Sequence, residues 1–121
     1  MQSLLDYCRA HESWLLDTMA ALVALESPTD DKAAVDRCGR ELEQRLTALG
    51  ARTSVFAQPH AGDHLRAEFG SGTRQVLLLG HFDTVWPIGQ LAQMPLVRAG
   101  DQLRGPGVRD LKAGIALGML S

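Results

Sequence analysis

The stretch that decides the expected fold reads Val76-Leu77-Leu78-Leu79-Gly80-His81-Phe82-Asp83-Thr84-Val85. It begins with an uninterrupted apolar run, which is typical of a strand that is buried on both faces of a sheet. We therefore predict a buried strand over residues 75–80 and expect His81 at its carboxyl end. In open α/β sheets, this edge of the sheet is where ligands and metals bind. The stretch thus predicts an α/β protein with a functional site at His81.

Two amphipathic helices are predicted ahead of this strand. Apolar residues recur at three- and four-residue intervals, which predicts one helix over about residues 3–25 and, after Pro28, a second helix that ends near Leu49. Gly50 stands where a left-handed cap is expected. The caps expected at the two amino-terminal ends are Ser3 for the first helix and Thr29, Asp30 or Asp31 for the second. The two predicted apolar faces consist of Leu4, Cys8, Leu15, Met19 and Leu22, and of Val35, Cys38, Leu42, Leu46 and Leu49.

The hydrophobic period changes to that of a strand after Gly50. Alternating or short apolar segments predict strands at 53–56 and 65–69, a hairpin that pairs 96–98 with 102–104, and a helix at 111–120. The order of two helices, mixed sheet strands and a helix predicts an α/β fold. Because a complete α/β sandwich needs further strands and covering helices, we expect an incomplete domain.

Composition and charge exclude several classes of protein. Hydrophobic residues make up 45% of the 121 residues and charged residues 21%, as in ordinary globular proteins. Twelve Lys and Arg are outnumbered by fourteen Asp and Glu, so the formal net charge of −2 argues against binding to nucleic acid. The longest apolar stretch, residues 19–25, is far shorter than the ~20 residues of a membrane-spanning helix.

The amino-terminal residues and the cysteines favour a cytoplasmic location. Asp6, Glu12 and Asp17 stand where a secretion signal would be apolar or basic, so we expect no signal peptide. Cys8 and Cys38 fall at apolar helical positions, and a reduced, packed role is favoured over a disulfide.

Two readings of His81 are open from the residues alone. A histidine at the end of a strand is most often an ordinary hydrogen-bonded boundary residue. A metal-bound imidazole, however, usually donates its second N–H to a carboxylate, and Asp83 lies two residues further on, on the same side of an extended chain. The pair His81 and Asp83 therefore makes a metal role a specific hypothesis.

Asp110 is the second candidate, and it too has two interpretations. It follows the glycine-rich segment Gly105-Pro106-Gly107 and precedes a predicted helix, where aspartate commonly acts as a cap. Alternatively, its two carboxylate oxygens bridge two divalent cations. Spacing does not decide between these roles, because His81 and Asp110 are 29 positions apart and only the fold can bring them together.

Competing motifs do not fit. The pattern Gly105-x-Gly107-x-x-Asp110 has a carboxylate where the dinucleotide-binding fingerprint has Gly or Ala. The segment that follows Gly80 begins with His81, where an aspartyl-phosphate loop would need its acidic nucleophile. No G-x-S-x-G elbow occurs, so serine-based acyl transfer has no candidate nucleophile.

The motif Leu77–Pro87, followed by Gly100-Asp101 and Gly105–Gly114, resembles the M20 family of zinc metallopeptidases, and most closely its glutamate carboxypeptidase branch. This resemblance implies a three-layer α/β/α catalytic domain. It further implies that His81 ligates one zinc ion, that Asp110 bridges two, and that Asp83 serves catalysis by orienting His81. It also implies a cis peptide bond between Asp110 and Leu111. Co²⁺ or Mn²⁺ are possible substitutes for zinc.

The sequence departs from the family after Asp110. In M20 enzymes a Glu-Glu pair, another acidic ligand and a distant histidine follow the bridging aspartate, whereas this chain has no Glu after Glu68 and no His after His81. We therefore expect residues 1–121 to be the amino-terminal portion of the catalytic domain, without its carboxyl-terminal part and without the lid and dimerisation domain. We expect this chain alone to bind zinc weakly and to lack turnover.

The resemblance implies hydrolysis of an amide bond by an exopeptidase that releases a terminal amino acid, such as glutamate, from a peptide or N-acyl conjugate. Two alternatives stay open, namely an N-acyl-amino-acid deacylase of the aminoacylase or desuccinylase kind, and a non-catalytic remnant of the fold. The expected partner is a small peptide or N-acyl amino acid, with neither nucleic acid nor membrane. A homodimer is one option for the intact protein.

Overall fold

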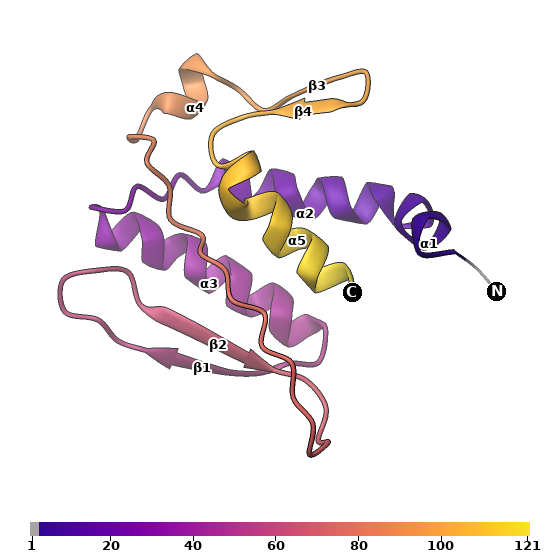
Figure 1. Ribbon diagram of the computed structural model, residues 1–121. Helices are drawn as coiled ribbons and strands as arrows, with labels where there is room; N and C mark the ends of the chain where they lie inside the picture. Colours follow the sequence, from indigo (N-terminus) through magenta and orange to yellow (C-terminus); the bar gives the residue numbers. More distant parts are fainter. Residues whose placement is uncertain (1–2) are drawn as a thin grey trace.

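The computed structural model describes residues 3–121 as helices and two small antiparallel sheets (Figure 1). The helices are α1 (Leu4–Ala10), α2 (Glu12–Ala24), α3 (Lys32–Ala48), α4 (Gln90–Gln93) and α5 (Ala113–Leu120), the last preceded by a kinked turn, η1 (Val108–Lys112). The strands are β1 (Arg52–Phe56), β2 (His64–Glu68), β3 (Val97–Ala99) and β4 (Gln102–Arg104). This mixture of helices and short strands confirms the expectation of an incomplete α/β fold.

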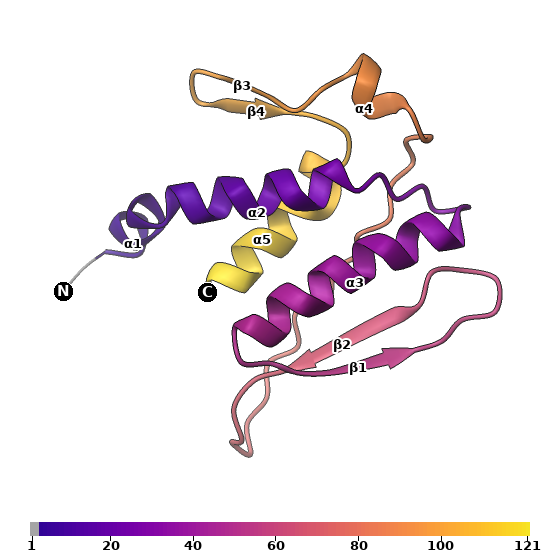
Figure 2. The ribbon, with the colours of Figure 1, turned by 180° about the vertical axis from the view of Figure 1, so that it is seen from behind.

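The core lies where α2, α3 and α5 meet. Viewed from behind, α3 lies between the β1–β2 hairpin and α2, and α5 crosses close to both helices (Figure 2). The buried centre is formed by Leu22 of α2 with Cys38 and Leu42 of α3. Phe82, from the segment that carries the candidate site, and Ile115 of α5 pack against this centre. Packing of Phe82 therefore fixes the position of the neighbouring residues His81 and Asp83.

The first predicted helix is divided in two. His11 has φ −110° and ψ 14°, and α1 ends there while α2 begins at Glu12. The His11 imidazole Nδ1 lies 2.8 Å from the Tyr7 carbonyl, a local contact that a periodicity argument does not detect. No residue of α1 is buried and Leu4 is 80% exposed, so the apolar face predicted for residues 3–25 packs only in its second part. The Ser3 cap is confirmed by its bond from the Asp6 N–H.

The second predicted helix is confirmed as α3. Asp31 is its cap, because its carboxylate accepts a hydrogen bond from the Ala34 N–H, and Gly50 has the left-handed φ of +98° expected after the helix. Val35, Cys38 and Leu42 are buried as predicted. Leu49 is the exception on this face, since it is 42% exposed at the end of the helix.

The two predicted strands at 53–56 and 65–69 and the predicted hairpin at 96–104 are all present, and the structure adds that the first two strands pair with each other. β1 and β2 pair antiparallel from Arg52 opposite Glu68 to Phe56 opposite His64. β3 and β4 also pair antiparallel, and Gly100, with φ +62°, lies in the turn between them. Both cysteines are free, Cys38 in the core and Cys8 half-buried, as the sequence predicts.

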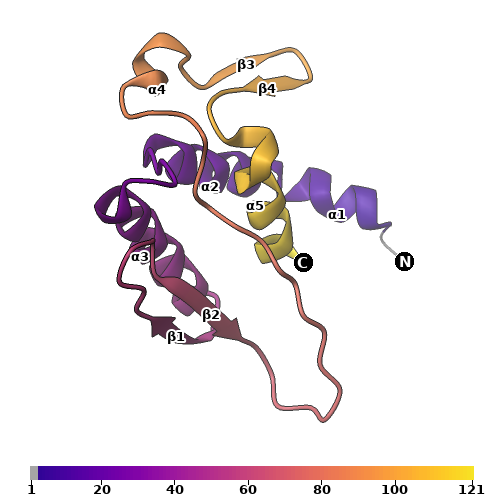
Figure 3. The same ribbon diagram turned by 60° about the vertical axis from the view of Figure 1, so that its left-hand side comes forward.

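The prediction of a buried strand at residues 75–80 is wrong for this chain. The segment is extended but belongs to neither sheet, and within residues 3–121 no hydrogen bond engages its backbone. Val76 is 90% exposed and Leu79 is 89% exposed. A strand buried on both faces needs neighbouring strands and covering helices, whereas this segment runs past α5 with no strand beside it (Figure 3). The apolar run thus indicates a buried environment, but residues 3–121 do not supply the strands and helices that would bury it.

Among residues 3–121, no helix combines the length and the apolar character that crossing a membrane would require.

Glu26 anchors the segment that follows the candidate site. Its carboxylate accepts hydrogen bonds from the N–H groups of Gly89 (3.0 Å) and Leu91 (3.1 Å) at the start of α4. These bonds, first that of Leu91 and then that of Gly89, hold the pKa of Glu26 below its ordinary value of 4.5. The ionised form is therefore favoured in the folded chain.

We expect Glu26→Gln to make the free energy of unfolding less dependent on pH in the acidic range. Because the pKa is depressed in the folded state, the contribution of Glu26 is fully present above the ordinary value of 4.5 and is lost as the pH falls through the folded-state pKa. At neutral pH the variant should have a free energy of unfolding that is lower by about 1 kcal/mol or less, since the Glu26 carboxylate is solvent-accessible. Urea unfolding at pH 7 and pH 3 measures the difference in unfolding free energy between the variant and the unaltered chain. If this difference is as large at pH 3 as at pH 7, the role assigned to the Glu26 carboxylate is contradicted.

Candidate metal centre

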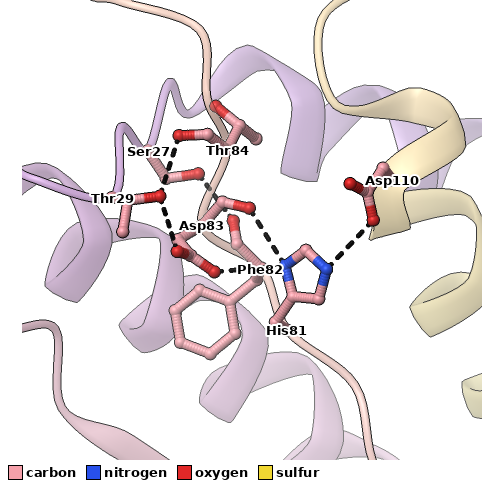
Figure 4. A network of polar contacts seen from close by, with 7 residues as sticks. All are labelled: Ser27, Thr29, His81, Phe82, Asp83, Thr84 and Asp110. Atoms are coloured by element: carbon pink, nitrogen blue, oxygen red, sulfur yellow. Dashed lines mark hydrogen bonds and ion pairs between the residues drawn. The ribbon is translucent and has the colours of Figure 1, made fainter.

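The fold brings His81 and Asp110 together. The imidazole Nε2 of His81 lies 3.0 Å from Oδ1 of Asp110, although the two residues are 29 positions apart (Figure 4). His81 comes from the extended segment and Asp110 from the kinked turn before α5. Their side chains are 49% and 79% exposed, so the pair opens to solvent rather than being buried in the core. The two residues predicted as metal ligands therefore lie side by side at a solvent-exposed position.

Asp83 lies on the other side of the His81 ring. The imidazole Nδ1 is 3.1 Å from Asp83 Oδ1 and 3.2 Å from the Asp83 carbonyl. The carboxylate is held in turn by Thr29, whose hydroxyl donates to Asp83 Oδ2 at 2.7 Å. The side chains form a line from Thr29 through Asp83 and His81 to Asp110 (Figure 4).

The loop between α2 and α3 is hydrogen-bonded to the segment that carries His81 and Asp83. Ser27 donates its hydroxyl to the Phe82 carbonyl at 2.7 Å, and its own carbonyl accepts from the Thr84 N–H at 2.7 Å. The Thr29 N–H donates to the Thr84 carbonyl at 2.9 Å. Sequence analysis missed Ser27 and Thr29 as parts of the site, and it offered no signal for them, because they lie more than 50 positions before their partners.

The turn that carries Asp110 is held from both ends. Gly107 has φ +74°, and a Cβ at this position would lie 2.7 Å from Thr84 Cγ2, so a glycine is required for this close approach. Lys112, which is 1% exposed, donates to the carbonyls of Leu22 (2.8 Å) and Leu25 (2.9 Å) at the end of α2. The Asp110–Leu111 peptide bond is cis, as the family resemblance implies.

Asp110 does not act as the cap that was one of its two interpretations. Neither η1 nor α5 has a side-chain hydrogen bond at its amino-terminal cap position. Among the described residues, the one hydrogen-bond partner of the Asp110 carboxylate is His81. The second oxygen of Asp110 therefore stays free to bind another group.

The surroundings of His81 favour its charged form. Partial burial lowers the pKa of His81, but the Asp83 carbonyl and the carboxylates of Asp110 and Asp83 outweigh burial, so that the pKa is raised above its ordinary value of 6.5. Both ring nitrogens face negatively charged or carbonyl oxygens. A positive ion placed between His81 and Asp110 would satisfy the same oxygens after the ring loses its proton.

The donors present fit part of a zinc site. Imidazole nitrogen and carboxylate oxygen are ordinary zinc ligands, and two ligands of a tetrahedral ion stand roughly 3.4 Å apart, close to the 3.0 Å between Nε2 and Oδ1. The Nδ1 contact with Asp83 is the arrangement that metal-bound histidines usually have. Within residues 3–121, however, no three histidine, cysteine or carboxylate side chains are arranged so that they could hold one ion, and none of His11, His60 and His64 completes the site.

Comparison with known proteins identifies the class of protein. Two kinds of curated proteins match most of the chain at 35–37% identity, and both are peptidases of the M20 family, so the chain belongs to the M20 family that its motifs resemble. No protein-family profile matches the chain.

The first of these relatives is carboxypeptidase G2 of Pseudomonas sp. (strain RS-16), which is 35% identical over 106 residues, covering 85% of this chain and 26% of the relative. The second is succinyl-diaminopimelate desuccinylase of Xanthomonas oryzae pv. oryzae, which is 37% identical over 111 residues, covering 84% of this chain and 27% of the relative. The chain therefore spans about a quarter of the length of these relatives.

Proposed function

We propose that the chain is the amino-terminal part of the catalytic domain of a zinc-dependent amide hydrolase. In this proposal His81 binds one zinc ion, Asp110 bridges two ions, and Asp83 orients the His81 ring. The observation that supports it best is the placement of His81 between two carboxylates, with Nε2 toward Asp110 and Nδ1 toward Asp83. Membership of a hydrolase family supports the same reaction.

Asp83, His81 and Asp110 would have different roles in binding the ions. Asp83 would accept the Nδ1 hydrogen, which leaves the Nε2 lone pair of His81 for the ion and makes the ring a stronger donor. Asp110 would offer the oxygen that lies 3.0 Å from Nε2 and a second oxygen that has no hydrogen-bond partner among the described residues. Bound zinc would lower the pKa of a coordinated water toward neutrality and polarise the carbonyl of the scissile amide. The glutamate that the family uses as general base has no counterpart after Asp110 in this sequence.

We expect the isolated chain to bind zinc weakly, because it supplies two donors from side chains. Structural zinc sites with a full ligand set bind with about 10–16 kcal/mol, so roughly half the ligands should give a dissociation constant of roughly 1–200 μM. Isothermal titration calorimetry measures this constant. Tight binding of two ions per chain would contradict the assignment of the remaining ligands to residues outside this sequence.

Two kinds of substrate are supported by the relatives. The carboxypeptidase suggests release of a terminal amino acid such as glutamate from a peptide or N-acyl conjugate, and the desuccinylase suggests removal of an N-acyl group. Both reactions break an amide bond, and the site residues described here serve either one.

A chimera tests the function. Residues 1–121 would replace the matching quarter of carboxypeptidase G2, and hydrolysis of a peptide with a carboxyl-terminal glutamate would be compared with hydrolysis of an N-succinyl amine. We expect the chimera to cleave one of these amides, and His81→Ala to abolish cleavage. A folded, zinc-loaded chimera that cleaves neither amide would contradict the proposed function.

A further inference from the structure

Thr29 lies outside both sequence motifs, yet its side chain reaches the candidate site. It belongs to the loop between α2 and α3, and its hydroxyl oxygen is 2.7 Å from Asp83 Oδ2 and 3.1 Å from the Thr84 carbonyl. A hydroxyl has a single hydrogen to donate. The shorter distance and the negative charge both favour the carboxylate as the acceptor, so the Thr29 hydrogen bond is made to Asp83.

The hydroxyl is held in place independently of Asp83. The Thr29 N–H donates to the Thr84 carbonyl at 2.9 Å, and the Thr84 N–H donates to the Ser27 carbonyl at 2.7 Å. These bonds form a parallel bridge between the α2–α3 loop and the segment that follows His81. Since backbone groups already join the two segments, the hydroxyl is not needed to fasten the loop.

The effect of the hydroxyl is instead on the rotation of the Asp83 carboxylate. The terminal torsion of an aspartate is broad and roughly two-fold, so an unrestrained carboxylate turns easily. With Oδ2 held by Thr29, Oδ1 points to Nδ1 of His81 at 3.1 Å (Figure 4). The same orientation leaves Nε2 directed at Asp110, 3.0 Å away.

We propose that Thr29 is a positioning residue of the cation site: its hydroxyl holds the Asp83 carboxylate so that Asp83 accepts the Nδ1 hydrogen of His81 and Nε2 faces the ion. This inference rests on the proposed function for its effect on cation binding. Its structural part, the control of the Asp83–His81 hydrogen bond by Thr29, holds with or without an ion.

The test compares three variants in the 121-residue chain. Thr29→Val keeps the shape and removes the hydroxyl, whereas Thr29→Ser keeps the hydroxyl. Thr53→Val is the matched control, because the Thr53 hydroxyl also donates to a carboxylate, that of Glu43, at 2.9 Å and away from the site. Partners that directly contact a metal-bound histidine typically change affinity by about 10- to 100-fold. Because Thr29 acts on His81 through Asp83, in zinc titrations we expect a smaller effect for Thr29→Val, about 3- to 10-fold weaker binding. Thr29→Ser and Thr53→Val should bind like the unaltered chain.

A second measurement does not depend on the ion. The ¹⁵N and ¹H resonances of the His81 ring report whether Nδ1–H is hydrogen-bonded to a carboxylate. We expect these resonances to move in Thr29→Val, to return in Thr29→Ser and to stay in place in Thr53→Val, in the absence of zinc.

The outcomes separate this inference from the proposed function. Unchanged ring resonances in Thr29→Val would overturn the positioning role, whatever the zinc titration gives. Shifted resonances with unchanged zinc affinity would also overturn it, provided that His81→Ala still weakens binding. If Thr29→Ser fails to restore the resonances, Thr29 has only a structural role and the inference is wrong. If His81→Ala binds zinc as well as the unaltered chain, the cation site is wrong, and the ring resonances alone decide whether Thr29 controls Asp83.

Discussion

Lys112→Met should destabilise the chain by about 2–4 kcal/mol. Lys112 is 1% exposed, and its ammonium donates to the carbonyls of Leu22 and Leu25. These carbonyls lie at the end of α2, where no further helical N–H reaches them. Methionine fills a similar volume but donates no hydrogen bond, and each buried carbonyl left without a partner costs about 1–3 kcal/mol.

One effect opposes this loss. Burial lowers the pKa of Lys112, because a charged ammonium is costly to remove from water. Replacing a buried charge by an apolar side chain can even be neutral when its partners are replaced as well. Here the two carbonyls remain, so the loss of hydrogen bonds should dominate.

Urea unfolding followed by circular dichroism measures the change. Lys32→Met is the matched control, because Lys32 makes its ion pairs with Asp36 and Asp63 at the surface, and surface pairs contribute little. Equal unfolding midpoints for Lys112→Met and the unaltered chain would contradict the role assigned to Lys112. A loss of the same size in both variants would show that removing any lysine has this effect.

His81→Ala should weaken zinc binding roughly 100-fold, since it removes one of two donors and therefore about half of the binding free energy. Asp110→Asn should act in the same direction, because the amide keeps the shape of the side chain but loses the negative charge. Calorimetric titration of each variant checks both expectations.

Two substitutions serve as controls for these variants. His64→Ala removes an exposed imidazole from β2, and Asp101→Asn changes an exposed carboxylate in the turn between β3 and β4. Among residues 3–121, neither side chain has a hydrogen bond or an ion pair to another potential ligand, whereas the side chains of His81 and Asp110 contact each other. If the controls weaken binding as much as the site variants do, zinc binds to histidine and carboxylate side chains generally, and no specific site exists.

Local features of the sequence predicted much of this fold. Helical periodicity located α2 and α3, a change to strand-like periodicity located β1 and β2, and Gly50 marked the end of α3. The segments that flank Ala99-Gly100-Asp101 located the β3–β4 hairpin. These features depend on interactions between near neighbours in the chain, which is why a single sequence reveals them. The break at His11 was missed because the apolar spacing continues across it.

The apolar run at residues 75–80 shows the limit of such reasoning. Its composition specifies an environment that is apolar on both sides, but the neighbours that create this environment must come from elsewhere in a fold. Residues 3–121 contain two hairpins, but neither pairs with the run, so Val76 and Leu79 stay exposed.

The candidate site was predicted in its central residues and missed in its supports. His81, Asp83 and Asp110 belong to recognisable motifs, and the structure brings them into one line of contacts. Thr29 and Lys112 act through contacts that span 54 and up to 90 positions. These contacts form only when α2 and the loop after it pack against the segments that carry His81 and Asp110, so no local sequence pattern predicts them.

The central claim is that His81 and Asp110 bind the same divalent cation. Crystals of the chain soaked in zinc and measured at the zinc absorption edge test this claim most directly, because anomalous scattering locates the ion itself. We predict an anomalous peak within bonding distance of His81 Nε2 and the Asp110 carboxylate, with Asp83 still at Nδ1. Zinc bound elsewhere on the chain, with these two side chains in contact only with each other, would contradict the account.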